Sequence, residues 1–101
     1  MTIAEAKAKY DEAFEFLLEK QQACFHARLK EQKSGRAYEK ALEETPGLDA
    51  KSRHKLCGDW YEAERQAENA LFEARQAEAA VEKANEQLLA AQAAAHHGQQ
   101  E

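Results

Sequence analysis

Residues that interrupt a helix are scarce in this chain of 101 residues, which has one proline and four glycines. The two cysteines, Cys24 and Cys57, are too few for a disulfide framework and indicate a reducing compartment. No apolar run approaches the ~18 residues that a membrane-spanning helix needs. The chain also does not open with a basic segment followed by an apolar stretch, as a secretory signal would. We therefore expect a cytoplasmic protein that does not enter a membrane.

What is abundant favours long helices. Alanine occurs 22 times and charged residues make up 33% of the chain, a mixture typical of coiled coils. The net charge of −5 is unevenly spread: residues 28–55 carry eight Lys or Arg and five Asp or Glu, whereas residues 56–101 carry three and nine. This balance does not favour bulk nucleic-acid binding, although it leaves a local basic site open.

The second half of the chain contains a coiled-coil seam, in which apolar residues follow one another by alternating steps of four and three. Most of its members are alanine, so each buries little area and the facing helix must supply the bulk. The seam consists of Leu56, Trp60, Ala63, Ala67, Ala70, Ala74, Ala77, Val81, Ala84, Leu88, Ala91 and Ala95.

The first half carries the same alternation with larger side chains. Its seam consists of Ile3, Ala6, Tyr10, Ala13, Leu17, Lys20, Cys24, Ala27, Glu31, Ser34, Tyr38, Ala41 and Thr45. We expect Lys20 to extend from this seam toward solvent and Glu78.

The two seams together predict an all-α fold, an antiparallel helical hairpin of the coiled-coil type, in a single domain of residues 1–97. Helix 1 is expected at about 3–45, a turn at 46–48 and helix 2 at about 49–97, with a disordered tail at 98–101. Thr2 with Glu5 and the side chain of Asp49 are the expected N-terminal caps. A short connection makes the helices antiparallel neighbours, so facing residues have numbers that add to roughly 95. Large side chains then lie opposite small ones.

Apolar side chains outside the seams exceed what one partner helix can cover. On helix 1 they and the seam span an arc of roughly 200° at 100° per residue. Scattered exposed residues are one explanation, because monomers tolerate them. A second packing surface is the other, either in a homodimeric helical bundle or against another protein. The candidate interface residues are Phe14, Phe16, Leu18, Phe25, Leu29 and Phe72.

Glycine weakens both helices at places that should face each other, Gly35 and Gly58. One explanation is packing: Gly35 makes room for the indole of Trp60, whose N–H is accepted by Glu31 or Ser34. The other is a kink or hinge on which residues 36–57 tilt as a basic head. The candidate basic tip that could contact an acidic partner or a nucleic-acid backbone consists of Arg28, Lys33, Arg36, Lys40, Lys51, Arg53, Lys55 and Trp60.

No pattern in the chain indicates a reaction or a cofactor. Cys24 and His26 point about 200° apart on a helix. The pair His54 and Cys57 shares a face but lies about 20 Å from Cys24 in a straight hairpin, so only an oligomer or a kinked head could assemble a metal site. A nucleophile with a neighbouring base and a glycine-rich phosphate loop are absent from the sequence. We therefore expect no enzyme, no cofactor and no metal site.

The sequence thus favours a non-enzymatic protein-interaction module, a small helical adaptor, chaperone or inhibitor that forms a homodimer and binds a larger protein. The alternative is a small regulatory dimer that binds nucleic acid through the basic tip. In plan the hairpin resembles several unrelated small bacterial proteins, among them export-stalk proteins of type III secretion and a plasmid regulator, but in architecture only.

Overall fold

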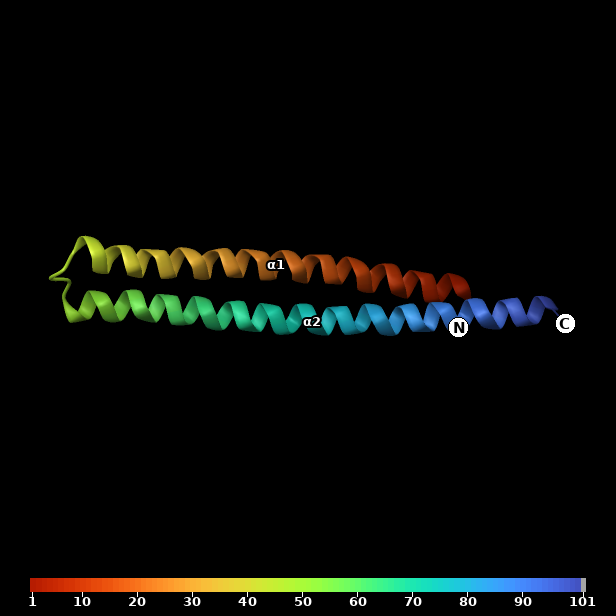
Figure 1. The fold of residues 1–101 in the computed structure, drawn as a ribbon. Coiled ribbons are helices and arrows are strands. Elements are labelled where there is room, and N and C mark those ends of the chain that lie inside the picture. Colours follow the sequence, from red (N-terminus) through yellow and green to blue (C-terminus); the bar gives the residue numbers. More distant parts are fainter. Residues whose placement is uncertain (101) are drawn as a thin grey trace. The chain divides into compact units, whose positions relative to one another are not determined.

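Two long helices make up almost the whole chain (Figure 1). The computed structural model describes the backbone of residues 1–100 and the side chains of residues 1–97. Helix α1 spans Ile3–Glu44 and helix α2 spans Ala50–Gln100, and no strand occurs within residues 1–100. The predicted all-α helical hairpin is confirmed.

The two expected caps form at the helix starts. The backbone N–H of Glu5 donates to Thr2 Oγ1 at 3.1 Å, and the backbone N–H of Ser52 donates to Asp49 Oδ2 at 3.1 Å. Hydrogen bonds from Ser52 hold the pKa of the Asp49 carboxyl below its ordinary value of 3.8. The turn between the helices, residues 45–49, is closed by the Leu48 N–H on the Thr45 carbonyl at 3.0 Å.

The helix bounds differ slightly from the expected ones. Helix α1 ends at Glu44, one residue before the predicted end at residue 45. The helix α2 begins after its Asp49 cap and extends past the expected end at residue 97 to Gln100. Residue 101, the last of the expected tail, lies outside the described residues.

The hairpin divides into two compact units, each with a segment of both helices. Unit 1 combines residues 1–21 with the part of α2 from residue 73 onward, and unit 2 comprises residues 22–72 with the turn. Cross-helix hydrogen bonds occur inside both units: Lys20 Nζ donates to Glu73 Oε2 in unit 1, and Lys30 Nζ donates to Gln66 Oε1 in unit 2, each at 3.1 Å. These pairs agree with the antiparallel register expected from the short turn.

Burial follows both predicted seams. Every seam position from Ala6 to Ala41 on α1 and from Leu56 to Ala91 on α2 is buried or half-buried, and only the terminal members Ile3, Thr45 and Ala95 are exposed. The register of the hairpin therefore follows from the alternating steps of three and four.

The core that these seams enclose is thin. Its buried hydrophobic residues are Ala6, Leu17, Cys24, Ala63, Ala67, Ala74, Ala77 and Ala84. Within the described side chains, no large side chain is fully buried. A core made mainly of alanine methyl groups contributes little hydrophobic stabilisation per residue, which leaves the larger apolar side chains outside it.

Two details of the expected packing are wrong, the acceptor of Lys20 and the acceptor of the Trp60 indole N–H. Lys20 pairs with Glu73 and not with Glu78, because Glu73 lies beside it across the seam. The helices run through Gly35 and Gly58 without interruption, so neither glycine ends a helix segment. No side chain in residues 1–97 accepts a hydrogen bond from the Trp60 indole, because the ring lies with its Nε1 edge against Gly35.

Candidate functional site

The apolar candidates of unit 1 are Phe14, Phe16 and Leu18, all between 43 and 49% exposed. Phe14 stacks on Tyr10, with ring centroids 6.2 Å apart. The ring of Phe16 lies 5.2 Å from Lys20 Nζ, in a cation–π contact. Residues two apart point about 200° apart on a helix, so Phe14 and Leu18 share one face of α1 and Phe16 lies on another. The three residues therefore do not form one patch.

The apolar candidates of unit 2 are also at the surface. On α1, Phe25 is 60% exposed and Leu29 is 38% exposed. On α2, Phe72 is 62% exposed. Phe25 makes an edge contact with the neighbouring ring of His26 at 5.9 Å. Leu42 of α1, which is not among the predicted interface residues, is 39% exposed.

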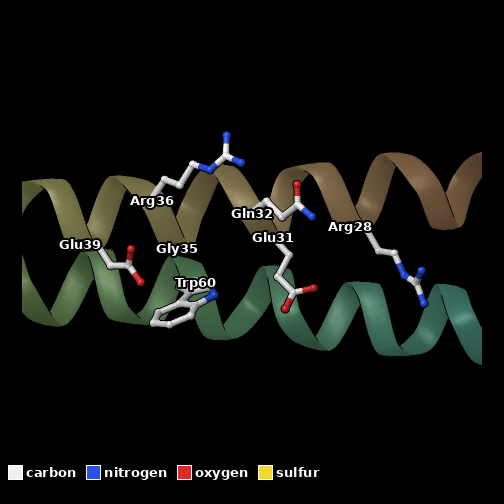
Figure 2. Close-up of a pocket in the computed structure, with 7 residues that line it drawn as sticks. All are labelled: Arg28, Glu31, Gln32, Gly35, Arg36, Glu39 and Trp60. Atoms are coloured by element: carbon white, nitrogen blue, oxygen red, sulfur yellow. The ribbon is translucent and has the colours of Figure 1, made fainter.

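An open groove of about 510 Å³ lies in unit 2 around Trp60 (Figure 2). In Figure 2 the indole is drawn over the α2 ribbon, on the side of α2 nearest the Gly35 label. A Cβ atom at Gly35 would lie 3.1 Å from both Cε2 and Nε1 of the indole, so the glycine is what admits the ring. The other groove residues come from α1 and are Arg28, Glu31, Gln32, Arg36 and Glu39.

Trp60 also contacts Tyr38, whose ring centroid lies 5.8 Å from that of the indole. The packing explanation for Gly35 is thereby confirmed. The indole Nε1–H has no acceptor among the described side chains and is not fully buried, and Trp60 lines the groove. A polar group that entered the groove could accept this hydrogen bond.

Only three members of the predicted basic tip meet in the groove, Arg28, Arg36 and Trp60. Glu31 and Glu39 line the same groove, so its formal charge is balanced. The remaining members do not extend it. Lys40 Nζ lies 3.9 Å from Glu44 Oε1 on the same helix, and Arg53 lines a separate hollow of about 300 Å³. Lys33, Lys51 and Lys55 are exposed and line neither hollow.

Side chains that could ligate a metal remain dispersed. The structure, over the residues it describes, contains no group of three or more His, Cys, Asp or Glu side chains placed to hold a metal ion. Cys24 is a buried free thiol in the seam, and the half-buried Cys57 lines a hollow with His54. The described helices also include none with the length and apolar character needed to cross a membrane.

Sequence reasoning missed Gln32 and Glu39 as site residues, because it considered only the basic and aromatic side chains of this segment. The spacing of these residues could have identified them. Starting from Arg28, they and Gly35 follow by steps of four, three and four, which places them on one face of α1.

No protein family, curated protein or solved structure matches this chain. The assignment of a function therefore depends on the chain's own surface.

Proposed function

We propose that this chain is a non-enzymatic protein-interaction module that forms a homodimer and binds a larger protein as a small adaptor, chaperone or inhibitor. The observation that carries the proposal is the contrast between its surface and its core. Among the side chains of residues 1–97, eleven large hydrophobic ones are exposed, whereas the buried core consists of alanines, one leucine and one cysteine. Exposed apolar side chains that share a helix face, as Phe14 and Leu18 do, are a common basis of protein association.

The exposed area supports the same proposal. The chain exposes 7821 Å², whereas a monomeric globular protein of 11.4 kDa exposes about 5,800 Å², an excess of about 2,000 Å². A standard protein–protein interface buries about 800 Å² on each partner. The excess is therefore large enough for more than one such contact.

The nucleic-acid alternative finds less support. Residues 22–72 carry nine Lys or Arg and nine Asp or Glu, so unit 2 has no formal net charge. Carboxylates line the groove beside Arg28 and Arg36 and would repel phosphates. We therefore place the interaction surface at the apolar side chains.

Phe14 and Leu18 are the residues on which to test binding of a larger protein, since they share one exposed face of unit 1. The chain is immobilised as wild type, as the double variant Phe14→Glu with Leu18→Glu, and as the control Gln76→Glu with Gln92→Glu. The control adds the same charge at exposed polar positions of unit 1. Circular dichroism first establishes that all three are equally helical.

Native lysate is then passed over each, and the retained proteins are identified by mass spectrometry. A protein retained by wild type and control but lost from the double variant is the expected result. Equal retention by all three, or no retained protein, would refute binding of a larger partner through this face.

A further inference from the structure

A second seam runs along α1 within unit 2, on the face beside the one that contacts α2. It consists of Phe25, Arg28, Gln32, Gly35, Glu39 and Leu42. These residues follow one another by steps of three and four, the pattern that places side chains against a second helix. Gly35 is buried against the Trp60 indole, whereas the other five residues are exposed. Apart from this contact, no segment of residues 1–97 covers the face, so the seam lacks a partner helix within the described residues.

The residue types of this seam complement those of the same seam running in the opposite direction. An antiparallel copy of α1 on a twofold axis between residues 33 and 34 places Phe25 opposite Leu42. The same axis places Arg28 opposite Glu39 and Gln32 opposite Gly35. Apolar thus meets apolar, cation meets anion, and a long side chain meets the smallest residue. A twofold interface requires this kind of pairing, because each contact occurs twice.

We propose that the partner of this seam is the same seam of a second copy, so that two α1 helices pair antiparallel across the groove at Trp60. The inference rests on the proposed interaction function and names its first partner. Charge complementarity favours a second copy over an unrelated helix, since the seam itself supplies both members of each ion pair. Gln32 and Gly35 lie at the centre, where helices approach closest.

The groove gives this pairing a place for the central side chain. Gly35 and Trp60 both line the groove, and the indole Nε1–H, on the ring edge that lies against Gly35, has no acceptor among the described side chains. Gln32 of the second copy, opposite Gly35, would enter the groove and bring an amide oxygen that can accept this hydrogen bond. The site is therefore complete only when two copies meet.

The area available fits two contacts of different kinds. A standard interface uses about 800 Å² per partner, less than half of the excess surface of the chain. Pairing through residues 25–42 of unit 2 leaves Phe14 and Leu18 of unit 1 for the larger protein. Failure of one contact can consequently be told apart from failure of the other.

Charge reversal tests the register. Arg28→Glu would place Glu opposite Glu39 of the second copy at two symmetric positions, and Glu39→Arg would place Arg opposite Arg28. Each single variant should raise the dimer dissociation constant by about tenfold or more in analytical ultracentrifugation. The double variant Arg28→Glu with Glu39→Arg should restore the wild-type value. The two positions are about 16 Å apart along one helix, so rescue cannot come from a contact within one chain.

Lys33→Glu is the matched control, because it makes the same charge change at an exposed position of α1 outside the seam. It should leave the dissociation constant unchanged. Acrylamide quenching of Trp60, the only tryptophan, provides a second readout. Quenching should fall as the wild-type protein is concentrated and should not fall in the Arg28→Glu variant.

Cysteine cross-linking tests the same register without charges, in a Cys24→Ala, Cys57→Ala background. A mixture of Phe25→Cys and Leu42→Cys chains should form a disulfide dimer on mild oxidation. Either variant alone should not, because an antiparallel twofold pairing separates the two copies of residue 25, or of residue 42, by about 25 Å.

Three outcomes would overturn the proposal. A wild-type chain that stays monomeric at high concentration removes the second copy from this seam. A dimer that is insensitive to Arg28→Glu, or equally sensitive to Lys33→Glu, places the interface elsewhere and leaves the protein-interaction function standing. Cross-linking of the Phe25→Cys variant with itself would show a parallel pairing and exclude the proposed axis.

Discussion

Gly35 and Trp60 are in contact across the hairpin, with the indole edge against the glycine so closely that an added Cβ would lie 3.1 Å from Nε1 and from Cε2. Gly58, the second glycine inside a helix, has no such neighbour, since nothing lies within 4 Å of a Cβ built there. The two glycines therefore have different structural roles, although the sequence presents them as a pair.

Replacing each glycine by alanine should separate these roles. Gly58→Ala should raise the free energy of unfolding by about 0.5–1 kcal/mol, because alanine loses less backbone entropy in a helix. Gly35→Ala gains the same helix propensity, but its methyl group displaces the indole, so we expect no net stabilisation. Urea unfolding followed by circular dichroism measures both values.

A double-variant cycle identifies the cause. In a Trp60→Leu background, Gly35→Ala should recover the stabilisation that it lacks in the wild type, since the edge of the indole is gone. If Gly35→Ala has the same small effect on the free energy of unfolding in both backgrounds, contact with the Trp60 indole is not the reason that alanine fails to stabilise the helix at residue 35.

Glu73 is predicted to stabilise the hairpin only slightly through its 3.1 Å contact with Lys20. The Lys20 side chain is 29% exposed and that of Glu73 is 53% exposed, so water and salt screen the pair. Glu73→Gln should cost about 0.5 kcal/mol at low salt and less in 1 M sodium chloride. Thermal unfolding at both salt concentrations measures this cost.

The control is Glu78→Gln, which removes the same charge from an α2 residue that does not pair with Lys20. It should change stability less than Glu73→Gln at low salt. A larger loss of stability from Glu78→Gln than from Glu73→Gln would indicate that Lys20 pairs with Glu78, as predicted from the sequence. It would contradict the observed contact with Glu73.

The register of the hairpin could be predicted from sequence because one pattern controls it. Steps of three and four place about one side chain of every helical turn against the partner helix, and a connection of a few residues fixes which residues meet. Trp60 next to Gly35 follows from this rule, since a large ring needs a small residue opposite it. The Asp49 cap follows from local chemistry alone.

The composition of the groove could not be read in the same way. Lys20 reaches Glu73 because a long flexible side chain selects among several acceptors that spacing does not distinguish. From the sequence, Arg28 and Arg36 are predicted to belong to a basic tip, whereas Glu31 and Glu39 line the same groove as these two arginines. Net charge over a window is thus a poor guide to the charge of one face.

Asp49 predicts a pH dependence of stability at the start of α2. Its carboxylate accepts the Ser52 N–H, and this hydrogen bond lowers its pKa in the folded chain below the ordinary value of 3.8. The unfolded chain therefore binds a proton more readily. The stabilisation is present above the unfolded pKa and is lost as the pH falls through the folded pKa.

Asp49→Asn isolates this contribution from the other carboxylates, because asparagine can cap a helix without titrating. The difference in unfolding free energy between wild type and variant should be constant from pH 5 to 7 and should shift against the wild type below about pH 4. A difference that does not change with pH would show that the pKa of Asp49 is the same in the folded and the unfolded chain.

Leu17 should be the side chain whose loss destabilises the hairpin most, because it is the largest residue of the buried core. It is 8% exposed, whereas Leu89, also in unit 1, is 56% exposed. Leu17→Ala removes buried methyl groups and leaves a cavity, at a cost of about 2–3 kcal/mol. Leu89→Ala makes the same chemical change at the surface and should cost about 0.5 kcal/mol or less. Urea unfolding measures both, and similar costs would show that Leu89 is buried in solution by a further contact.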